Sequence, residues 1–120
     1  MAIHTDLQIH KVAYDLYGLI VQLVKNLPKD LKPAIGYPMR DQCRALTVLI
    51  QRTNIARKRD KLPHLDAILE GVSLVELDLR TLRDGRTIAT KLYAAAILLT
   101  TSIGKQASGL RKAFDVPPVA

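Results

Sequence analysis

A chain of 120 residues is long enough for one domain, and its 18 Lys and Arg against 11 Asp and Glu give a formal charge of +7. That charge indicates a polyanionic partner, or else a generally basic surface. Aliphatic residues dominate, with only 4% aromatic, which favours helices over a β-sandwich. One cysteine excludes an intrachain disulfide, and no stretch resembles a signal peptide or the ~20 apolar residues of a membrane span. We therefore expect a cytoplasmic protein that does not enter a membrane.

The first two predicted helices span about residues 5–27 and 37–57. From Ile9 to Leu27, apolar residues follow one another at steps of 4, 3, 4, 3 and 4, which is typical of a helix that buries one face. The turn LPKDLKPAIGYP, rich in proline, separates this helix from the second. The apolar row expected on the second helix consists of Met39, Cys43, Leu46, Ile50 and Thr53.

The third and fourth predicted helices span about residues 61–83 and 87–114. Asp60 is expected to cap the third helix, with Pro63 tolerated in its first turn, and the fourth follows Asp84 or Gly85. No alternating pattern indicates a strand. The four segments predict an all-α, up-down-up-down four-helix bundle that forms a single domain over residues 1–120. The row expected to face the core on the third helix is Leu65, Ile68, Val72, Val75, Leu79 and Leu82. On the fourth helix it is Leu92, Ala96, Leu99, Ile103, Leu110 and Phe114.

Two of the predicted helices carry more apolar residues than a single row. The first has a second row that includes Tyr14 and Tyr17, and the fourth adds Ile88, Ala95 and Leu98. Such wide faces belong either to the core of a small bundle or to a contact with another copy of the chain. We favour the second interpretation, which predicts a homo-oligomer.

Charge is segregated along the chain. Residues 40–61 carry a net charge of +5, whereas residues 62–79 contain four acidic residues and no Lys or Arg. The basic segment could follow a phosphate backbone, or it could pair with the acidic helix within a subunit or across an interface. Few aromatic residues are present for base stacking, so binding should be electrostatic and weakly selective. The residues predicted to bind nucleic acid are Arg40, Arg44, Arg52, Arg57, Lys58, Arg59 and Lys61.

No motif in the chain predicts catalysis. The histidines fall in different elements, no glycine-rich phosphate loop is present, and Cys43 lies on an apolar row. Asp66 and Glu70 share one helix face, but no Glu-x-x-His motif accompanies them as in a two-metal site. We therefore expect no enzymatic activity, no metal and no cofactor.

Four segments, in order, carry a resemblance to a known family: NLPKDLKPAIG, QRTN, DKLPHLD and LEGVSLVELDLRTLRDG. From about Leu7 to Lys112 the chain resembles the accessory variability determinant (Avd) proteins of diversity-generating retroelements. These belong to the superfamily of four-helix-bundle proteins encoded in ribosomal-RNA intervening sequences. The most specific matches are Leu27–Asp30, Asn54 and Asp60–Leu65. The ribosomal-RNA relatives carry a NIAEG-like run, whereas Arg-Lys-Arg follows NIA here, which favours the retroelement branch.

The resemblance implies a specific role. Avd proteins assemble into a pentameric ring, associate with a reverse transcriptase and bind nucleic acid while a template RNA is copied with adenine mutagenesis. The expectation is thus a non-catalytic accessory subunit whose partners are the reverse transcriptase, RNA and further copies of itself, with DNA or an RNA/DNA hybrid as alternative ligands. One alternative is a ribosome-associated or general RNA-binding bundle without a polymerase partner. Another is a structural oligomer whose basic and acidic faces neutralise each other.

Overall fold

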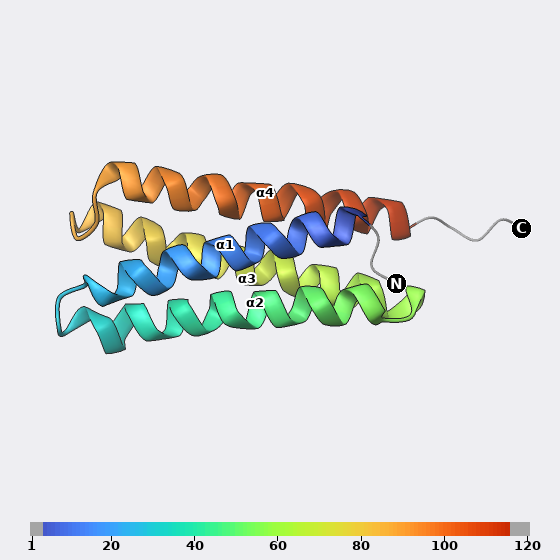
Figure 1. Cartoon of the computed structure of the whole chain (residues 1–120), viewed down its shortest axis with the longest axis horizontal. Coiled ribbons are helices and arrows are strands. Elements are labelled where there is room, and N and C mark those ends of the chain that lie inside the picture. The colour runs from blue at the N-terminus through green and yellow to red at the C-terminus, as the bar shows by residue number, and fades with distance from the viewer. Residues whose placement is uncertain (1–3, 116–120) are drawn as a thin grey trace, which may run out of the picture.

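The computed structural model describes the backbone of residues 4–115 and the side chains of residues 8–115. Four α-helices occur in this range: α1 (His4–Lys25), α2 (Tyr37–Ile55), α3 (Lys58–Asp84) and α4 (Thr90–Phe114), with a short π-helical turn η1 (Lys32–Gly36) before α2. No strand occurs in it. The helices lie side by side along one axis, and α1 packs on α2, α2 on α3, α3 on α4, and α4 on α1 (Figure 1). This arrangement confirms the predicted up-down-up-down bundle for the described residues.

The bundle is a rod of 57 × 23 × 22 Å, so the connections at its two ends are far apart. The α2–α3 turn lies at one end, together with the C-terminus of α4, and the α1–α2 and α3–α4 connections lie at the other (Figure 1). None of the described helices has both the length and the apolar character needed to cross a membrane.

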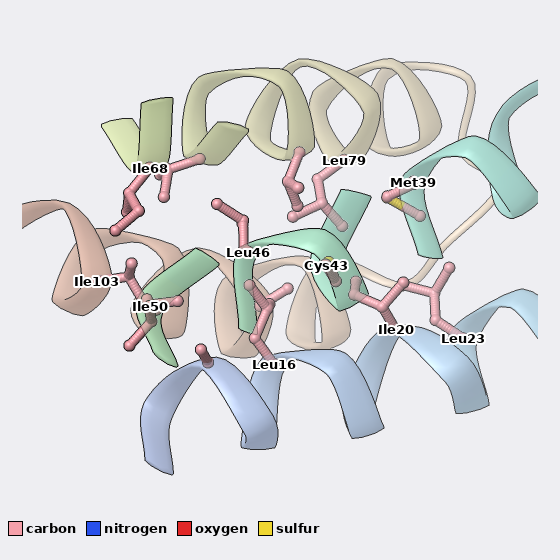
Figure 2. Packing of buried hydrophobic residues seen from close by; sticks show 14 of the residues in the cluster. Leu16, Ile20, Leu23, Met39, Cys43, Leu46, Ile50, Ile68, Leu79 and Ile103 are labelled. Atoms are coloured by element: carbon pink, nitrogen blue, oxygen red, sulfur yellow. The ribbon is translucent and has the colours of Figure 1, made fainter. Parts of the chain in front are cut away.

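The predicted apolar rows of α1, α2 and α3 form the core. Leu16, Leu46 and Leu79 are almost completely buried and converge from three helices, as Figure 2 shows. Cys43 packs among them as a small hydrophobic side chain, which confirms its predicted structural place. Burial, with a smaller contribution from the charge of Asp78, raises the pKa of the Cys43 thiol to about 12. The thiol is therefore protonated at neutral pH and a poor nucleophile.

The core row of α4 agrees with the prediction at Ala96 and Ile103 and differs at its other positions. Its fully buried residues are Ala96, Thr100, Ile103 and Ala107, whereas the expected Leu92, Leu99, Leu110 and Phe114 are only partly buried. Small side chains let α4 approach the other helices closely. The buried hydroxyl of Thr100 donates a hydrogen bond of 2.7 Å to the carboxylate of Glu76 on α3, so its polar atom is satisfied.

The α2–α3 turn is shorter than expected. Ala56 and Arg57 are both extended, with ψ of 154° and 152°, and α3 begins at Lys58 instead of residue 61. Arg57 is therefore the N-cap, and the prediction that Asp60 caps the helix was wrong. Asp60 lies in the first turn, where its negative charge favours the helix N-terminus. Pro63 lies in the second turn, not the first.

The α3–α4 connection also differs from the prediction, because α4 begins at Thr90 instead of residue 87. Arg86, and not Gly85, adopts the left-handed conformation that ends α3, with φ of 56°. The Arg86 N–H donates to Arg83 O and the Thr87 N–H to Leu82 O, each at 2.9 Å, which is the Schellman pattern. The chain is then extended at Ala89, the N-cap of α4.

Arg86→Gly should stabilise the protein by about 0.5–1 kcal/mol, because glycine adopts positive φ without the steric cost that arginine has. Urea unfolding followed by circular dichroism would measure the change. A matched control is Arg80→Gly, an exposed arginine inside α3, which should destabilise by about 1 kcal/mol. Equal destabilisation by both replacements would contradict the assignment of the helix end.

The α1–α2 connection is more regular than a proline-rich turn predicts. Residues 32–36 form the π-helical turn η1, and α2 follows it directly. Gly36 is buried in this turn, and a Cβ added there would lie 2.9 Å from Leu27 Cδ1 and 3.1 Å from Val24 Cγ1. The close packing fixes the position of η1 against the end of α1.

Candidate nucleic-acid interface

The outer face of α2 is the first part of the predicted site. Because Met39, Cys43 and Ile50 point into the core, Arg44 and Arg52 project to solvent. The two arginines flank Ala45, Val48 and Leu49, and together these five residues line a shallow hollow of about 370 Å³. Two guanidinium groups beside an apolar floor can bind phosphates while the floor contacts sugar or base.

The second part is the α2–α3 turn at the end of the bundle. Arg57, Lys58 and Arg59 follow one another in the sequence and are all exposed. Within residues 8–115, neither they nor Arg44 and Arg52 form an ion pair with an acidic side chain. Five cations are therefore available to an external anion along one helix and its adjoining turn.

Arg40 lies at the other end of α2 and differs from these five. Its guanidinium carbon lies 4.8 Å from the centroid of the Tyr37 ring, and its Nη2 lies 3.5 Å from Asp41 Oδ1. The ring and the carboxylate restrict its orientation and neutralise part of its charge. The structure thus places Arg40 apart from Arg57–Arg59, which lie beyond the C-terminus of the same helix (Figure 1).

Lys61 has a structural role. Its ammonium donates hydrogen bonds to the backbone oxygens of Thr53, at 2.8 Å, and Asn54, at 3.3 Å, and lies 5.4 Å from the centroid of the Phe114 ring. These oxygens belong to the last turn of α2, where helix carbonyls lack partners. Lys61 therefore closes the end of α2 and is less available to an external ligand than Arg57 or Arg59.

Lys61→Met should lower the free energy of unfolding by about 1–2 kcal/mol, because two carbonyls at the end of α2 lose a charged donor. Its effect on RNA affinity should be small. Arg57→Met, a matched removal of one exposed cation from the same turn, should do the opposite: weaken RNA binding and leave stability nearly unchanged. Chemical denaturation and fluorescence anisotropy with labelled RNA measure the two quantities. The assignment fails if Lys61→Met weakens RNA binding more than Arg57→Met does.

Helical spacing with steps of 4, 3, 4, 3 and 4 predicts one polar stripe, made of Arg40, Arg44, Thr47, Gln51, Asn54 and Lys58. Part of this stripe is engaged in contacts within the chain. The Thr47 hydroxyl donates to Cys43 O at 3.0 Å, and the Gln51 side chain contacts the His10 ring at 3.1 Å, which joins α2 to α1. Lys58 belongs to α3, so the stripe does not continue along a single helix. The candidate interface therefore consists of exposed cations and not of a continuous polar row.

The acidic residues of α3 do not neutralise the cations of α2 within the described chain. The Asp66 carboxylate instead accepts hydrogen bonds from Arg111 of α4, which lower the pKa of Asp66. Glu76 accepts from Thr100, as described above. Pairing of the basic and acidic helices inside one subunit is therefore not observed, and pairing across an interface between copies stays a prediction.

One basic cluster that the sequence pattern does not indicate lies at the end of the rod where the α1–η1 connection is. Lys25 of α1 and Lys32 of η1 line a small hollow together with Arg40 and Tyr37 of α2. These residues come from three separate elements, so only the arrangement of the bundle shows that they are neighbours. Because these residues are separated in the sequence, the sequence shows only a general excess of lysine and does not predict this cluster.

Within residues 8–115, no group of three or more His, Cys, Asp or Glu side chains could hold a metal ion. The fold and the surface together define a basic, all-helical bundle. Comparisons with protein-family models, curated proteins and solved structures gave no significant match.

Proposed function

We propose that this protein is a non-catalytic accessory subunit of a diversity-generating retroelement, in which it binds nucleic acid and the reverse transcriptase to support mutagenic retrohoming. One observation carries the nucleic-acid part: Arg44, Arg52 and Arg57–Arg59 are exposed along α2 and its C-terminal turn without an acidic partner in the described chain. The retroelement part rests on the resemblance of the segments NLPKDLKPAIG and DKLPHLD to Avd proteins.

The proposed binding is electrostatic. Lysine and arginine release condensed counterions when they contact phosphates, so affinity should fall steeply with salt. Of the aromatic residues, Tyr17, Tyr93 and Phe114 are partly buried against the core. Tyr14 and Tyr37 are exposed, but they belong to α1 and to the start of α2, so no exposed ring of the described chain lies at the α2–α3 turn for reading bases. Such a surface would bind a template RNA, a cDNA or their hybrid near a polymerase, independently of the nucleotide sequence. The chemistry would belong to the reverse transcriptase.

The proposal includes assembly of several copies into a ring. It is supported by large apolar side chains on the surface: Leu98 of α4 is 73% exposed and Tyr14 of α1 is 63% exposed. Leu74 and Leu77 are exposed together on the outer side of α3. Burial of such residues between copies would remove apolar surface from water. The number five comes from the resemblance, and native mass spectrometry would measure it.

The experiment that tests the role is affinity purification of the tagged protein from its native host, followed by identification of bound proteins and RNA. A reverse transcriptase with one non-coding RNA of the same genetic element would support the proposal. Ribosomal proteins, or bulk RNA without a polymerase, would contradict the retroelement role and favour a general RNA-binding bundle. A parallel purification of a variant without the exposed cations, described below, separates RNA-mediated capture from direct protein contact.

A further inference from the structure

A hollow of about 220 Å³ lies between the last turn of α1 and the start of α2, beside η1. Two valines of α1 contribute apolar surface to it, and three cations and a tyrosine supply the polar groups. No acidic residue lines it. Its lining residues are Val21, Val24, Lys25, Lys32, Tyr37 and Arg40.

The backbone segments that carry the three cations are held together by the local fold. Lys25 belongs to the last turn of α1, and Lys32 is the first residue of η1, which packs against α1 through the buried Gly36. Arg40 is oriented by the Tyr37 ring, 4.8 Å from its guanidinium carbon. Because the elements are packed together, the backbone does not need to rearrange to bring the cations near one another when a ligand binds, and less backbone entropy is lost.

The charge of the hollow suits an anion with two negative charges. Of its three cations, only Arg40 forms an ion pair within the described chain, with Asp41 at 3.5 Å. About two positive charges therefore remain to be neutralised. A phosphate monoester carries about −1.5 to −2 charges at pH 7, whereas a phosphodiester carries one. Two ammonium groups and a guanidinium offer the charge-assisted donors that phosphate oxygens accept.

The size of the hollow limits the ligand further. Pockets for drug-sized molecules enclose about 300–1,000 Å³, so 220 Å³ suits a phosphate group with few additional atoms. We propose that this hollow is a binding site for a phosphate group that carries close to two negative charges. This phosphate group is either free phosphate or the terminal phosphate of a nucleic acid. The nucleic-acid source rests on the function proposed above.

The site lies at the α1–α2 connection, and the α2–α3 turn that carries Arg57–Arg59 lies at the opposite end of the rod (Figure 1). A strand that followed the outer face of α2 could therefore contact the turn cations with its backbone and place its terminal phosphate in the hollow. The 5′-phosphate should strengthen binding of a short oligonucleotide about tenfold over the same oligonucleotide with a 5′-hydroxyl, because it adds charge-assisted hydrogen bonds.

Two measurements test the site. Isothermal titration calorimetry with inorganic phosphate reports binding without any nucleic acid, and anisotropy with matched 5′-phosphate and 5′-hydroxyl oligonucleotides reports the terminal group. Lys25→Gln and Lys32→Gln should each abolish phosphate binding and the difference between the oligonucleotides. Lys29→Gln removes an exposed lysine of the same connection that does not line the hollow, and it should change neither. Circular dichroism and thermal unfolding would establish that all three variants remain folded.

The outcomes separate the two proposals. Phosphate binding that is lost in Lys25→Gln and Lys32→Gln supports the site, even if the protein binds no RNA. If the 5′-phosphate has no effect on oligonucleotide binding but free phosphate binds, free phosphate is the source. The proposed site is rejected if the wild-type protein does not bind inorganic phosphate and the 5′-phosphate does not strengthen oligonucleotide binding. It is also rejected if Lys29→Gln abolishes these effects as well. Loss of RNA binding on removal of Arg57–Arg59 tests the proposed function independently.

Discussion

Removal of four exposed cations from the α2–α3 end should reduce RNA affinity by roughly 10²- to 10³-fold at about 0.1 M salt, with no loss of helicity. These side chains contact no acidic residue in the described chain, so their removal leaves no buried charge behind. The slope of log affinity against log salt should become shallower by about 3 for a single-stranded ligand, since each lost phosphate contact contributes about 0.7. The variant is Arg52→Gln, Arg57→Gln, Lys58→Gln and Arg59→Gln.

A control variant distinguishes binding at one defined interface from general attraction by the net charge of the protein. It replaces four exposed lysines elsewhere on the bundle, so both variants change the formal charge from +7 to +3. If the cations of α2 and its turn form the interface, this control should retain most of its RNA affinity. An equal loss in the two variants would mean that binding is diffuse, and the interface would be rejected. The control is Lys11→Gln, Lys29→Gln, Lys91→Gln and Lys105→Gln.

The helical architecture could be predicted because apolar spacing determines which face of a helix is buried. The predicted row that runs from Ile9 along α1 to Leu27, just beyond the end of this helix, is buried, and the predicted rows of α2 and α3 are buried as well. The complete buried row of α4 could not be predicted from apolar spacing. There, Ala96 and Ile103 are buried as predicted, but closeness to the other helices also selects the small residues Thr100 and Ala107. Hydrophobicity alone favours Leu99 and Leu110, which are only partly buried.

The ends of the helices, and whether each charged side chain is exposed or bonded within the chain, depend on tertiary contacts that a sequence pattern does not show. Asp60 has a good N-cap side chain, but α2 ends at Ile55 and only two extended residues precede α3. Lys61 and Arg57 are both cations of one basic run. Only the fold shows that Lys61 bonds the carbonyls of α2 while Arg57 stays exposed. The number of charges was predictable, and their availability was not.

Gly71→Ala should destabilise the bundle by about 1–3 kcal/mol, although alanine is the better helix former. Gly71 is buried in the middle of α3, where it faces α2. A Cβ at this position would lie 2.6 Å from Leu46 Cδ2 and 2.8 Å from Gln42 Nε2. Gln42 can move aside, but Leu46 is 1% exposed and packed on all sides, so its displacement disturbs the core.

Two further variants show whether contact with Leu46 is the cause. Gly18→Ala changes an exposed glycine of α1 that has no atom within 4 Å of the added Cβ, so it should stabilise by about 0.5–1 kcal/mol. Leu46→Ala alone should cost about 2–5 kcal/mol through the cavity it leaves. Combined with Gly71→Ala, it removes the clash, and the added methyl group fills part of that cavity. The double variant should therefore be more stable than the sum of the single effects predicts, by about 1–2 kcal/mol in urea unfolding. Strict additivity would show that Gly71 is not required for the close approach of α2 and α3.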